Sequence, residues 1–190
     1  MKNLKTDTHY YFLTNFLSNF QHIPKGIVYN GLTFYTTEHL FMYRKAEHFK
    51  DTESMELIYN AKTAQESKDY GRAVKGYNDV SWFKVREQVM YEANYLKYTT
   101  DEDLKKKLLD TGDLILVESN LKDKHWSCGL SVDDPLIYDE NNWTGQNLLG
   151  KILMKIREEI KSDLIKQAHD LIDELELTII YMFVSANSVK

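Results

Sequence analysis

The stretch Thr37–Ala46, with the sequence TEHLFMYRKA, constrains the fold more than any other segment. From Thr37 to Phe49 the apolar side chains recur at intervals typical of a helix with one buried face. These positions are Leu40, Phe41, Tyr43, Ala46 and Phe49. A threonine at the start, Thr36 or Thr37, is suited to cap this helix because its hydroxyl can accept a hydrogen bond from a free N–H of the first turn.

Two ionisable residues of this helix, Glu38 and Lys45, are seven positions apart and share one face. At 1.5 Å per residue they lie about 10 Å apart along the axis. Helical side chains lean toward the N-terminus, which brings Lys45 back toward Glu38. The pattern alone favours a structural interpretation, in which Glu38 interacts with the helix dipole and Lys45 is a solvated charge.

Regular segments extend on both sides of this helix. Asn30-Gly31 indicates a turn between two short β-like pieces, 27–29 and 32–34. The apolar run Leu114–Val117 predicts a buried strand. Further helices are expected at about 54–61, 63–70, 81–98, 101–109 and 146–160, and from 163 onward. The loop 122–145 is long for a compact domain, and such loops are more often functional than idle.

Composition and charge describe an ordinary globular protein with one domain. The 190 residues are 43% apolar and 28% charged, and two prolines with eight glycines leave no flexible linker. The 24 basic and 29 acidic residues give a net charge of −5. Proteins that grip long duplexes usually carry a basic surplus, because phosphate contacts supply their affinity. A local basic pocket for one phosphate or nucleotide remains compatible with this charge.

Several classes of site are absent from the sequence. There is no Walker loop and no G-x-G-x-x-G motif, and the six histidines lack ligand spacing, so we expect no metal and no cofactor. The single cysteine, Cys128, excludes an internal disulfide and is more typical of a packing residue than of a nucleophile. The N-terminus lacks a signal peptide, and the most apolar run, 175–184, is too short to span a bilayer. These features predict a cytoplasmic protein without membrane contact.

A second group of candidate residues follows the predicted strand. Glu118 ends the strand region, and Asp123 and Trp126 lie three residues apart in the loop beyond it. An acid and an indole so placed can offer a proton-handling group and a stacking wall for a base. The equal alternative is an acid facing water beside a tryptophan that anchors the loop.

Two segments contain features that are typical of anion-binding sites. Asn147 lies in 145–150, where a glycine turn opens a helix whose free N–H groups can hold an anion, although Asn147 can equally be only a cap. Arg72 follows Gly71 and can clamp a phosphate, although an arginine at a helix end usually satisfies carbonyl groups.

Taken in order, these segments resemble the NADAR superfamily, which includes the YbiA-like N-glycosidases. The matching pieces are Leu17-Ser18-Asn19-Phe20, Gly31, Thr37-Glu38-His39-x-Phe41, Lys45-Ala46, Gly71-Arg72, Trp82 with Arg86 and Met90, Leu108-Leu109-x-Thr111-Gly112, Val117-Glu118, Asp123-x-x-Trp126, Trp143-x-Gly145-x-Asn147-x-Leu149-Gly150 and Leu153-Met154-x-x-Arg157. Met42 departs from the glutamine that is common in the family. The segment Trp126–Gly129 replaces the commoner Trp-Gly-x-Gly.

The resemblance implies a mainly α-helical (α+β) domain of YbiA-like fold with a few short strands. It covers residues 1–160 and leaves a helical extension, 161–190, outside the match. It also implies hydrolysis of the bond between ribose C1 and an exocyclic nitrogen of a ribosylamine-type nucleotide. The expected substrates contain ribose phosphate or ADP-ribose: phosphoribosylamino-pyrimidine intermediates of riboflavin synthesis, or ADP-ribose on guanine bases of modified DNA. The alternative is a non-catalytic protein that sequesters ADP-ribose-type nucleotides.

The resemblance also assigns roles to particular residues. The expected catalytic residues are Glu38, Lys45 and Asp123. The expected substrate-binding residues are Asn19, Phe20, His39, Arg72, Trp126, Gly129 and Asn147. A desolvated, neutral Lys45 can exchange onto C1 of the ring-opened imine, while Glu38 or Asp123 transfers protons. The alternative is direct attack by water between two carboxylates, with Lys45 holding a hydroxyl or phosphate group.

The extension carries an apolar stripe on one side of its predicted helix. The stripe consists of Leu164, Ile165, Ala168, Leu171, Ile172 and Leu175. We expect the extension to pack against the domain or to associate with a second subunit, because a large exposed apolar surface promotes aggregation.

Overall fold

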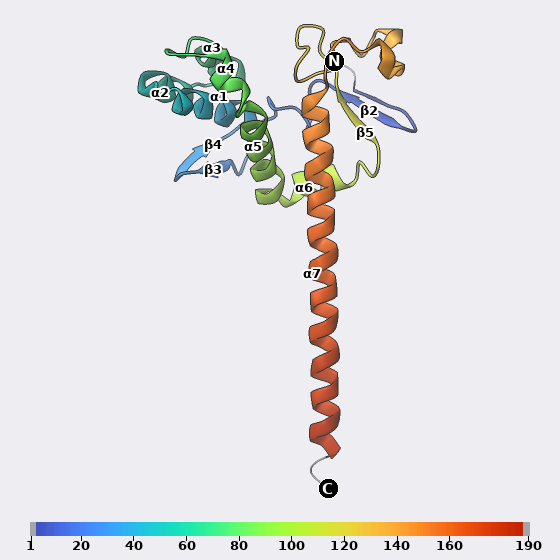
Figure 1. Cartoon of the computed structure of the whole chain (residues 1–190). Helices are drawn as coiled ribbons and strands as arrows, with labels where there is room; N and C mark the ends of the chain where they lie inside the picture. The colour runs from blue at the N-terminus through green and yellow to red at the C-terminus, as the bar shows by residue number, and fades with distance from the viewer. Residues whose placement is uncertain (1–2, 188–190) are drawn as a thin grey trace. The chain divides into compact units, whose positions relative to one another are not determined.

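The computed structural model describes the backbone of residues 3–187 and the side chains of residues 3–178. Of the described residues, those up to Ile156 form one compact unit and those from Arg157 onward form a second. In the first unit, helices α1–α5 and one β-hairpin are grouped together, apart from strands β2 and β5 (Figure 1). The fold is therefore mainly α-helical with a few short strands, as the sequence predicts.

Three short strands form a sheet with the order β1 (Leu4–Lys5), β2 (His9–Phe12) and β5 (Ile115–Glu118). Strand β1 is antiparallel to β2, and β2 is parallel to β5, with Phe12 opposite Glu118. Because the carboxyl ends of parallel strands meet at the same edge of a sheet, the chain that follows β2 and the chain that follows β5 leave the sheet side by side. This pairing places Glu118 at the edge where the candidate site lies.

The predicted hairpin is present as β3 (Ile27–Tyr29) and β4 (Leu32–Phe34), which pair antiparallel. Its turn residues, Asn30 and Gly31, have φ angles of 49° and 78°. A two-residue turn with positive φ at both positions matches the twist of the flanking strands and favours Asn-Gly.

The remaining regular structure of the first unit is helical. Its helices are α1 (Thr37–His48), α2 (Thr52–Tyr59), α3 (Ala64–Arg72), α4 (Asp79–Phe83), α5 (Arg86–Thr100) and α6 (Glu102–Leu109), with 3₁₀ turns η1 (Pro135–Tyr138) and η2 (Glu140–Asn142). Thr36 caps α1 by accepting a hydrogen bond from the His39 N–H, and Thr63 caps α3 in the same way from Glu66. The predicted helix 81–98 is divided: α4, capped by Asn78, ends before a turn at Lys84 and Val85, where α5 starts anew.

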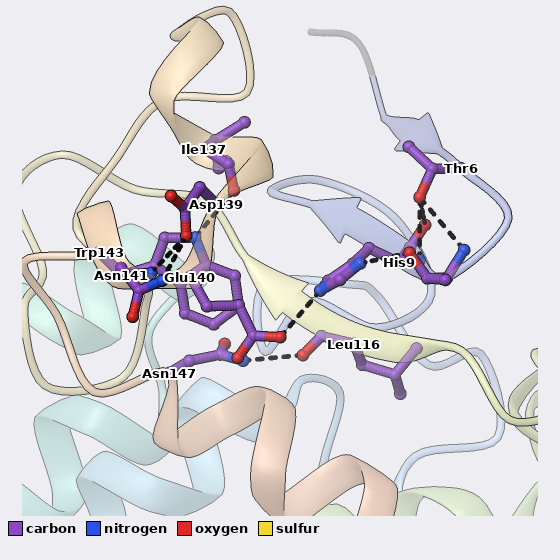
Figure 2. Close-up of polar contacts among 10 residues, drawn as sticks. Thr6, His9, Leu116, Ile137, Asp139, Glu140, Asn141, Trp143 and Asn147 are labelled. Atoms are coloured by element: carbon purple, nitrogen blue, oxygen red, sulfur yellow. Dashed lines mark hydrogen bonds and ion pairs between the residues drawn. The ribbon is translucent and has the colours of Figure 1, made fainter.

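The long loop 122–145 is folded against the sheet. Tyr11, Val117, Cys128, Leu130 and Ile137 form one apolar cluster that joins this loop to β2 and β5. Cys128 is fully buried in it, which confirms its interpretation as a packing residue. Figure 2 shows two polar contacts of the same loop. The indole N–H of Trp143 donates to the carbonyl of Ile137 at 2.8 Å, and Nε2 of His9 lies 3.1 Å from Oε1 of Glu140.

The C-terminal part of the chain differs from the prediction of two helices. A single helix, α7 (Leu148–Asn187), runs through both predicted segments. Neither proline nor glycine occurs between Lys151 and Asn187, so nothing in the sequence interrupts the backbone hydrogen bonds at Ser162 and Asp163. The side chains of residues 161–178 are exposed, the apolar stripe included. Within the described residues, no helix combines the length and apolarity that crossing a membrane requires.

Candidate active site

A cavity of about 660 Å³ opens in the first unit at the carboxyl ends of β2 and β5. Its lining combines the segment after β2, the start of α1, three residues of α3 and the segment after β5. Six of the ten residues that the sequence predicted as functional line this cavity. They are Asn19, Phe20, Glu38, Arg72, Asp123 and Trp126.

Glu38 lies in the first turn of α1 and is only 3% exposed. Its N–H donates to the carbonyl of Asn19 at 3.0 Å, which ties α1 to the segment after β2. Burial raises the pKa of the Glu38 carboxyl, Asp123 adds to the rise, and the Lys68 ammonium opposes it. The carboxylate oxygen Oε1 lies 3.6 Å from Lys68 Nζ and has no hydrogen-bond partner among the described residues. This buried oxygen therefore carries an unsatisfied hydrogen-bonding capacity beside the cavity.

Glu118, the last residue of β5, contributes a second carboxyl group to the cavity. Burial raises its pKa to about 8, with further contributions from the negative charges of Asp123 and Glu38 that exceed the opposing effect of Lys68. The carboxyl group is therefore largely neutral at pH 7 and can donate a proton. The sequence places Glu118 in the second candidate group but assigns it no role, because its burial depends on the pairing of β5 with a distant strand.

Asp123 is anchored to its own loop. Its Oδ1 accepts hydrogen bonds from the N–H groups of His125 at 3.0 Å and Trp126 at 2.8 Å. The indole of Trp126 meets the ring of Phe41 edge to face, with a centroid separation of 5.6 Å. Asp123 thus fixes the loop that holds the indole at the cavity, and its charge raises the pKa of both glutamates.

Three cationic side chains line the same cavity: Lys68, Arg72 and Lys122. Lys68 lies against Glu38 and also 5.2 Å above the ring centroid of Phe20. Arg72 is paired with Asp69 at 3.0 Å but its side chain is 65% exposed. The cavity thus combines these three cations with three acidic side chains, Glu38, Glu118 and Asp123, and the cations can bind a phosphate group.

Lys45 lies outside the lining of this cavity. Its ammonium donates to the carbonyl of Gly71 at 2.8 Å and lies 4.3 Å above the ring of Tyr77. Burial lowers its pKa, which is the direction that the Schiff-base mechanism needs. The direction of this pKa shift fits the Schiff-base hypothesis, whereas the hydrogen bond to Gly71 holds the amine outside the lining of the cavity.

His39 and Gly129 also lie outside this lining. The Nδ1 atom of His39 is 2.7 Å from the Thr36 hydroxyl and Nε2 is 3.2 Å from the Ala61 carbonyl, so the ring links the start of α1 to the end of α2. Gly129 has φ of +77°, and a Cβ there would lie 2.4 Å from the Thr144 hydroxyl. A close approach of two loop segments explains this glycine.

Asn147 lies outside the lining as well, but it holds the strand that carries Glu118 (Figure 2). Its amide donates to the Leu116 carbonyl at 2.9 Å, and its Oδ1 accepts from the Glu118 N–H at 3.1 Å. Gly150 allows this contact, since a Cβ there would lie 2.0 Å from the Leu116 carbonyl oxygen. The motif around Asn147 therefore positions Glu118, and both of these side-chain contacts are made to β5.

Comparisons with known proteins agree with this architecture. A family model described as the NADAR domain matches residues 3–161. An N-glycosidase of Acanthamoeba polyphaga mimivirus is 39% identical over 124 residues, which cover 65% of this chain and 73% of that protein. An N-glycosidase of Nostoc punctiforme is 36% identical over 145 residues, which cover 76% of this chain and 85% of that protein. The NMR structure of the E. coli protein YbiA aligns with a TM-score of 0.68 and 28% identity, over 86% of this chain and 90% of that chain.

Proposed function

Because the chain belongs to the NADAR family, we propose that it is a hydrolase that cleaves the bond between ribose C1 and the exocyclic nitrogen of a ribosylamine-type nucleotide. The observation that carries this proposal is the pair of glutamates in one cavity, the buried Glu38 beside an ammonium group and the half-buried Glu118 with its pKa raised to about 8. Burial raises the pKa of both carboxyl groups, but the ammonium 3.6 Å from Glu38 favours its anionic form, so Glu38 is suited to act as the base and Glu118 as the acid. The names of two relatives as N-glycosidases support the same reaction class.

The roles of the two glutamates follow from their surroundings. Glu118, neutral at pH 7, donates its proton to the leaving nitrogen as the C1–N bond breaks. Glu38, whose anionic form is favoured by Lys68, accepts a proton from the water molecule whose oxygen bonds to C1. The products are the free amine and a ribose with a hydroxyl group on C1. Both glutamates return to their starting states when Glu38 releases its proton to solvent and Glu118 takes one up from solvent.

This route differs from the Schiff-base mechanism at Lys45. The amine of Lys45 is held by the Gly71 carbonyl and would have to leave it to reach a sugar in the cavity. The water route needs no such movement, because the glutamates already line the cavity. The structure therefore favours direct attack by water, with Lys45 supporting the α1–α3 contact.

The proposed substrate carries at least one phosphate group, which Arg72 and Lys122 would bind at the cavity. Trp126 supplies a face on which the base or the ribose packs. Both substrate types implied by the family resemblance meet these requirements: a phosphoribosylamino-pyrimidine and an ADP-ribosylated guanine, the latter including modified DNA.

The test is direct. The protein is incubated with each substrate type, and the released amine or base is measured by mass spectrometry. We expect release with the native protein and loss of release with Glu38→Gln and Glu118→Gln. Glu56→Gln is the matched control, because Glu56 is exposed on α2 and does not line the cavity that the two glutamates share. Tight binding of ADP-ribose without release from either substrate would favour the alternative, a nucleotide-sequestering protein.

We further propose that the extension mediates self-association. The exposed stripe on α7 includes Leu171, Ile172 and Leu175, which are 57%, 51% and 54% exposed. A second copy of the same helix would cover this stripe. Truncation after Glu159 should reduce the molecular mass measured by sedimentation equilibrium to that of a monomer. A native chain that is already monomeric would refute self-association.

A further inference from the structure

The loop segment that carries Trp126 is held from two sides. On its backbone side, the carbonyl groups of His125 and Trp126 accept hydrogen bonds from the N–H groups of Leu148 at 3.3 Å and Leu149 at 3.0 Å. On its side-chain side, Nη2 of Arg86, the first residue of α5, donates to Nδ1 of His125 at 3.1 Å. The indole that lines the cavity therefore follows directly after a residue that α5 holds by its side chain.

Arg86 and His125 lie outside the lining of the cavity. The guanidinium of Arg86 lies 4.3 Å from the ring centroid of Phe83, which orients its plane. The ring of His125 meets the indole of Trp126 edge to face, with a centroid separation of 4.5 Å and an interplanar angle of 75°. A continuous series of contacts thus connects Arg86 with the indole at the cavity.

The hydrogen bond from Arg86 selects one protonation state of His125. A guanidinium stays protonated and has no acceptor atom, so Nδ1 must accept and the neutral ring carries its proton on Nε2. This Nε2 atom is buried and has no hydrogen-bond partner among the described residues. An unpaired buried donor costs free energy, which a purely packing role of the ring would not require. Such a local cost is typical of residues that support a functional site.

We propose that Arg86 is a positioning residue, which holds the Trp126 indole in place for the substrate through the neutral ring of His125. This inference rests on the proposed function, in which the base or the ribose packs on Trp126. A protonated His125 would present an N–H group to the guanidinium in place of an acceptor. The positioning should therefore fail in mild acid.

The charges around His125 define the pH range of this effect. Burial lowers the pKa of His125 below its ordinary value of 6.5, the Arg86 guanidinium lowers it further, and Glu87 and Asp123 oppose the shift. The hydrogen bond is therefore present above pH 6.5 and is lost as pH falls through the lowered pKa. KM of the native protein should rise over that range. His125→Asn should remove this rise, since its amide oxygen can accept in place of Nδ1 and does not titrate.

Steady-state kinetics of Arg86→Met test the role above pH 6.5, with whichever substrate type is cleaved. KM should rise at least about threefold with little change in kcat, because a displaced indole loses part of a stacking effect worth about 5- to 150-fold. His125→Leu removes the acceptor, leaves Arg86 in place, and should raise KM by the same factor. In a Trp126→Ala background neither substitution should raise KM further, since the positioned ring is gone.

Lys84→Met is the matched control, because Lys84 is an exposed cation close to Arg86 in the sequence and does not line the cavity. Its KM and kcat should equal those of the native protein. A lower kcat with unchanged KM in Arg86→Met would overturn the inference. An effect of Arg86→Met on KM that is equally large in the Trp126→Ala background would overturn it as well.

An NMR titration separates this inference from the proposed hydrolysis. The ring resonances of His125 and the indole N–H resonance of Trp126 are followed with pH in the native protein and in Arg86→Met. Loss of the guanidinium should raise the pKa of His125 and shift the Trp126 resonance. If it does so while neither substrate is cleaved, only the hydrolase proposal fails. An unchanged pKa and an unchanged indole resonance would refute the positioning role even if both substrates were cleaved.

Discussion

The substitution Glu118→Gln tests the proposed acid through both stability and activity. In the folded protein burial raises the pKa of Glu118 to about 8, from a reference value of 4.5. Between these two pH values the folded state binds the proton and the unfolded state does not. The free energy of unfolding of the native protein should therefore fall as pH rises from 4.5 to 8. Glutamine has the shape of the protonated acid and does not titrate. The free energy of unfolding of the variant should therefore not show this decrease with pH.

The magnitude follows from the pKa difference. Each unit corresponds to about 1.36 kcal/mol, which sets an upper limit of about 5 kcal/mol on the penalty above pH 8. Glu118 is only partly buried at the cavity, and water there reduces the penalty, so we expect about 1–3 kcal/mol. Glu118→Gln should match the native protein at pH 5 and exceed its stability by this amount at pH 8.5.

Urea unfolding monitored by tryptophan fluorescence at the two pH values measures this difference, with Glu56→Gln as the control for a lost surface charge. The same variant should lose about 10²- to 10⁴-fold in kcat/KM, the usual contribution of a general acid. In the native protein kcat/KM should decline above pH 8 as the acid ionises. A stability difference that is equal at pH 5 and pH 8.5, or a fully active variant, would show that Glu118 is not the neutral acid of this site.

Four further predictions concern residues around the cavity. Lys45→Arg should retain activity, and borohydride added during turnover should leave no sugar on Lys45; an adduct there would restore the Schiff-base mechanism. Trp126→Ala should raise KM by the loss of about 1–3 kcal/mol of stacking while its melting temperature changes little; unfolding with unchanged KM would make it a core anchor. Gly150→Ala should lower stability by about 1–3 kcal/mol and lower kcat, since its Cβ would push Leu116 and the strand of Glu118 aside. A stable, active variant would show that the close contact between Gly150 and Leu116 is not needed to position Glu118. Lys97 is fully buried with a pKa lowered to about 7, so native stability should rise from pH 7 to pH 10 relative to Lys97→Met, as measured by urea unfolding; a constant difference would show that the pKa of this amine is not lowered in the folded protein.

The parts of the fold that were predictable from the sequence are those specified by neighbouring residues. The Asn30-Gly31 turn needs only positive φ at two positions, and the cap of α1 needs only a threonine three residues before a free N–H. The division between α4 and α5 was missed because Lys84 and Val85 are not helix breakers. It accompanies the burial of Trp82 against Phe41, a contact between distant segments.

The candidate site was predictable to a similar extent and for the same reason. Motif resemblance located Glu38, Asp123 and Trp126, which the structure brings to one cavity. The partners of Lys45 were not predictable, because the Gly71 carbonyl reaches its amine only after α1 and α3 pack together. The raised pKa of Glu118 likewise depends on the pairing of β5 with β2 and on charges contributed by α1 and α3.

The net charge of −5 and the binding of a phosphorylated substrate are compatible, because the charges of the cavity are arranged locally. Lys68 favours the anionic form of Glu38 and also lines the cavity that would bind the phosphate group of the substrate. A phosphate group bound near Lys68 would draw the ammonium away from Glu38 and weaken the opposing charge that limits the rise in the pKa of this carboxyl. Glu38 would then become a stronger base only when the substrate is in place, which couples recognition of the phosphate group to the activation of water.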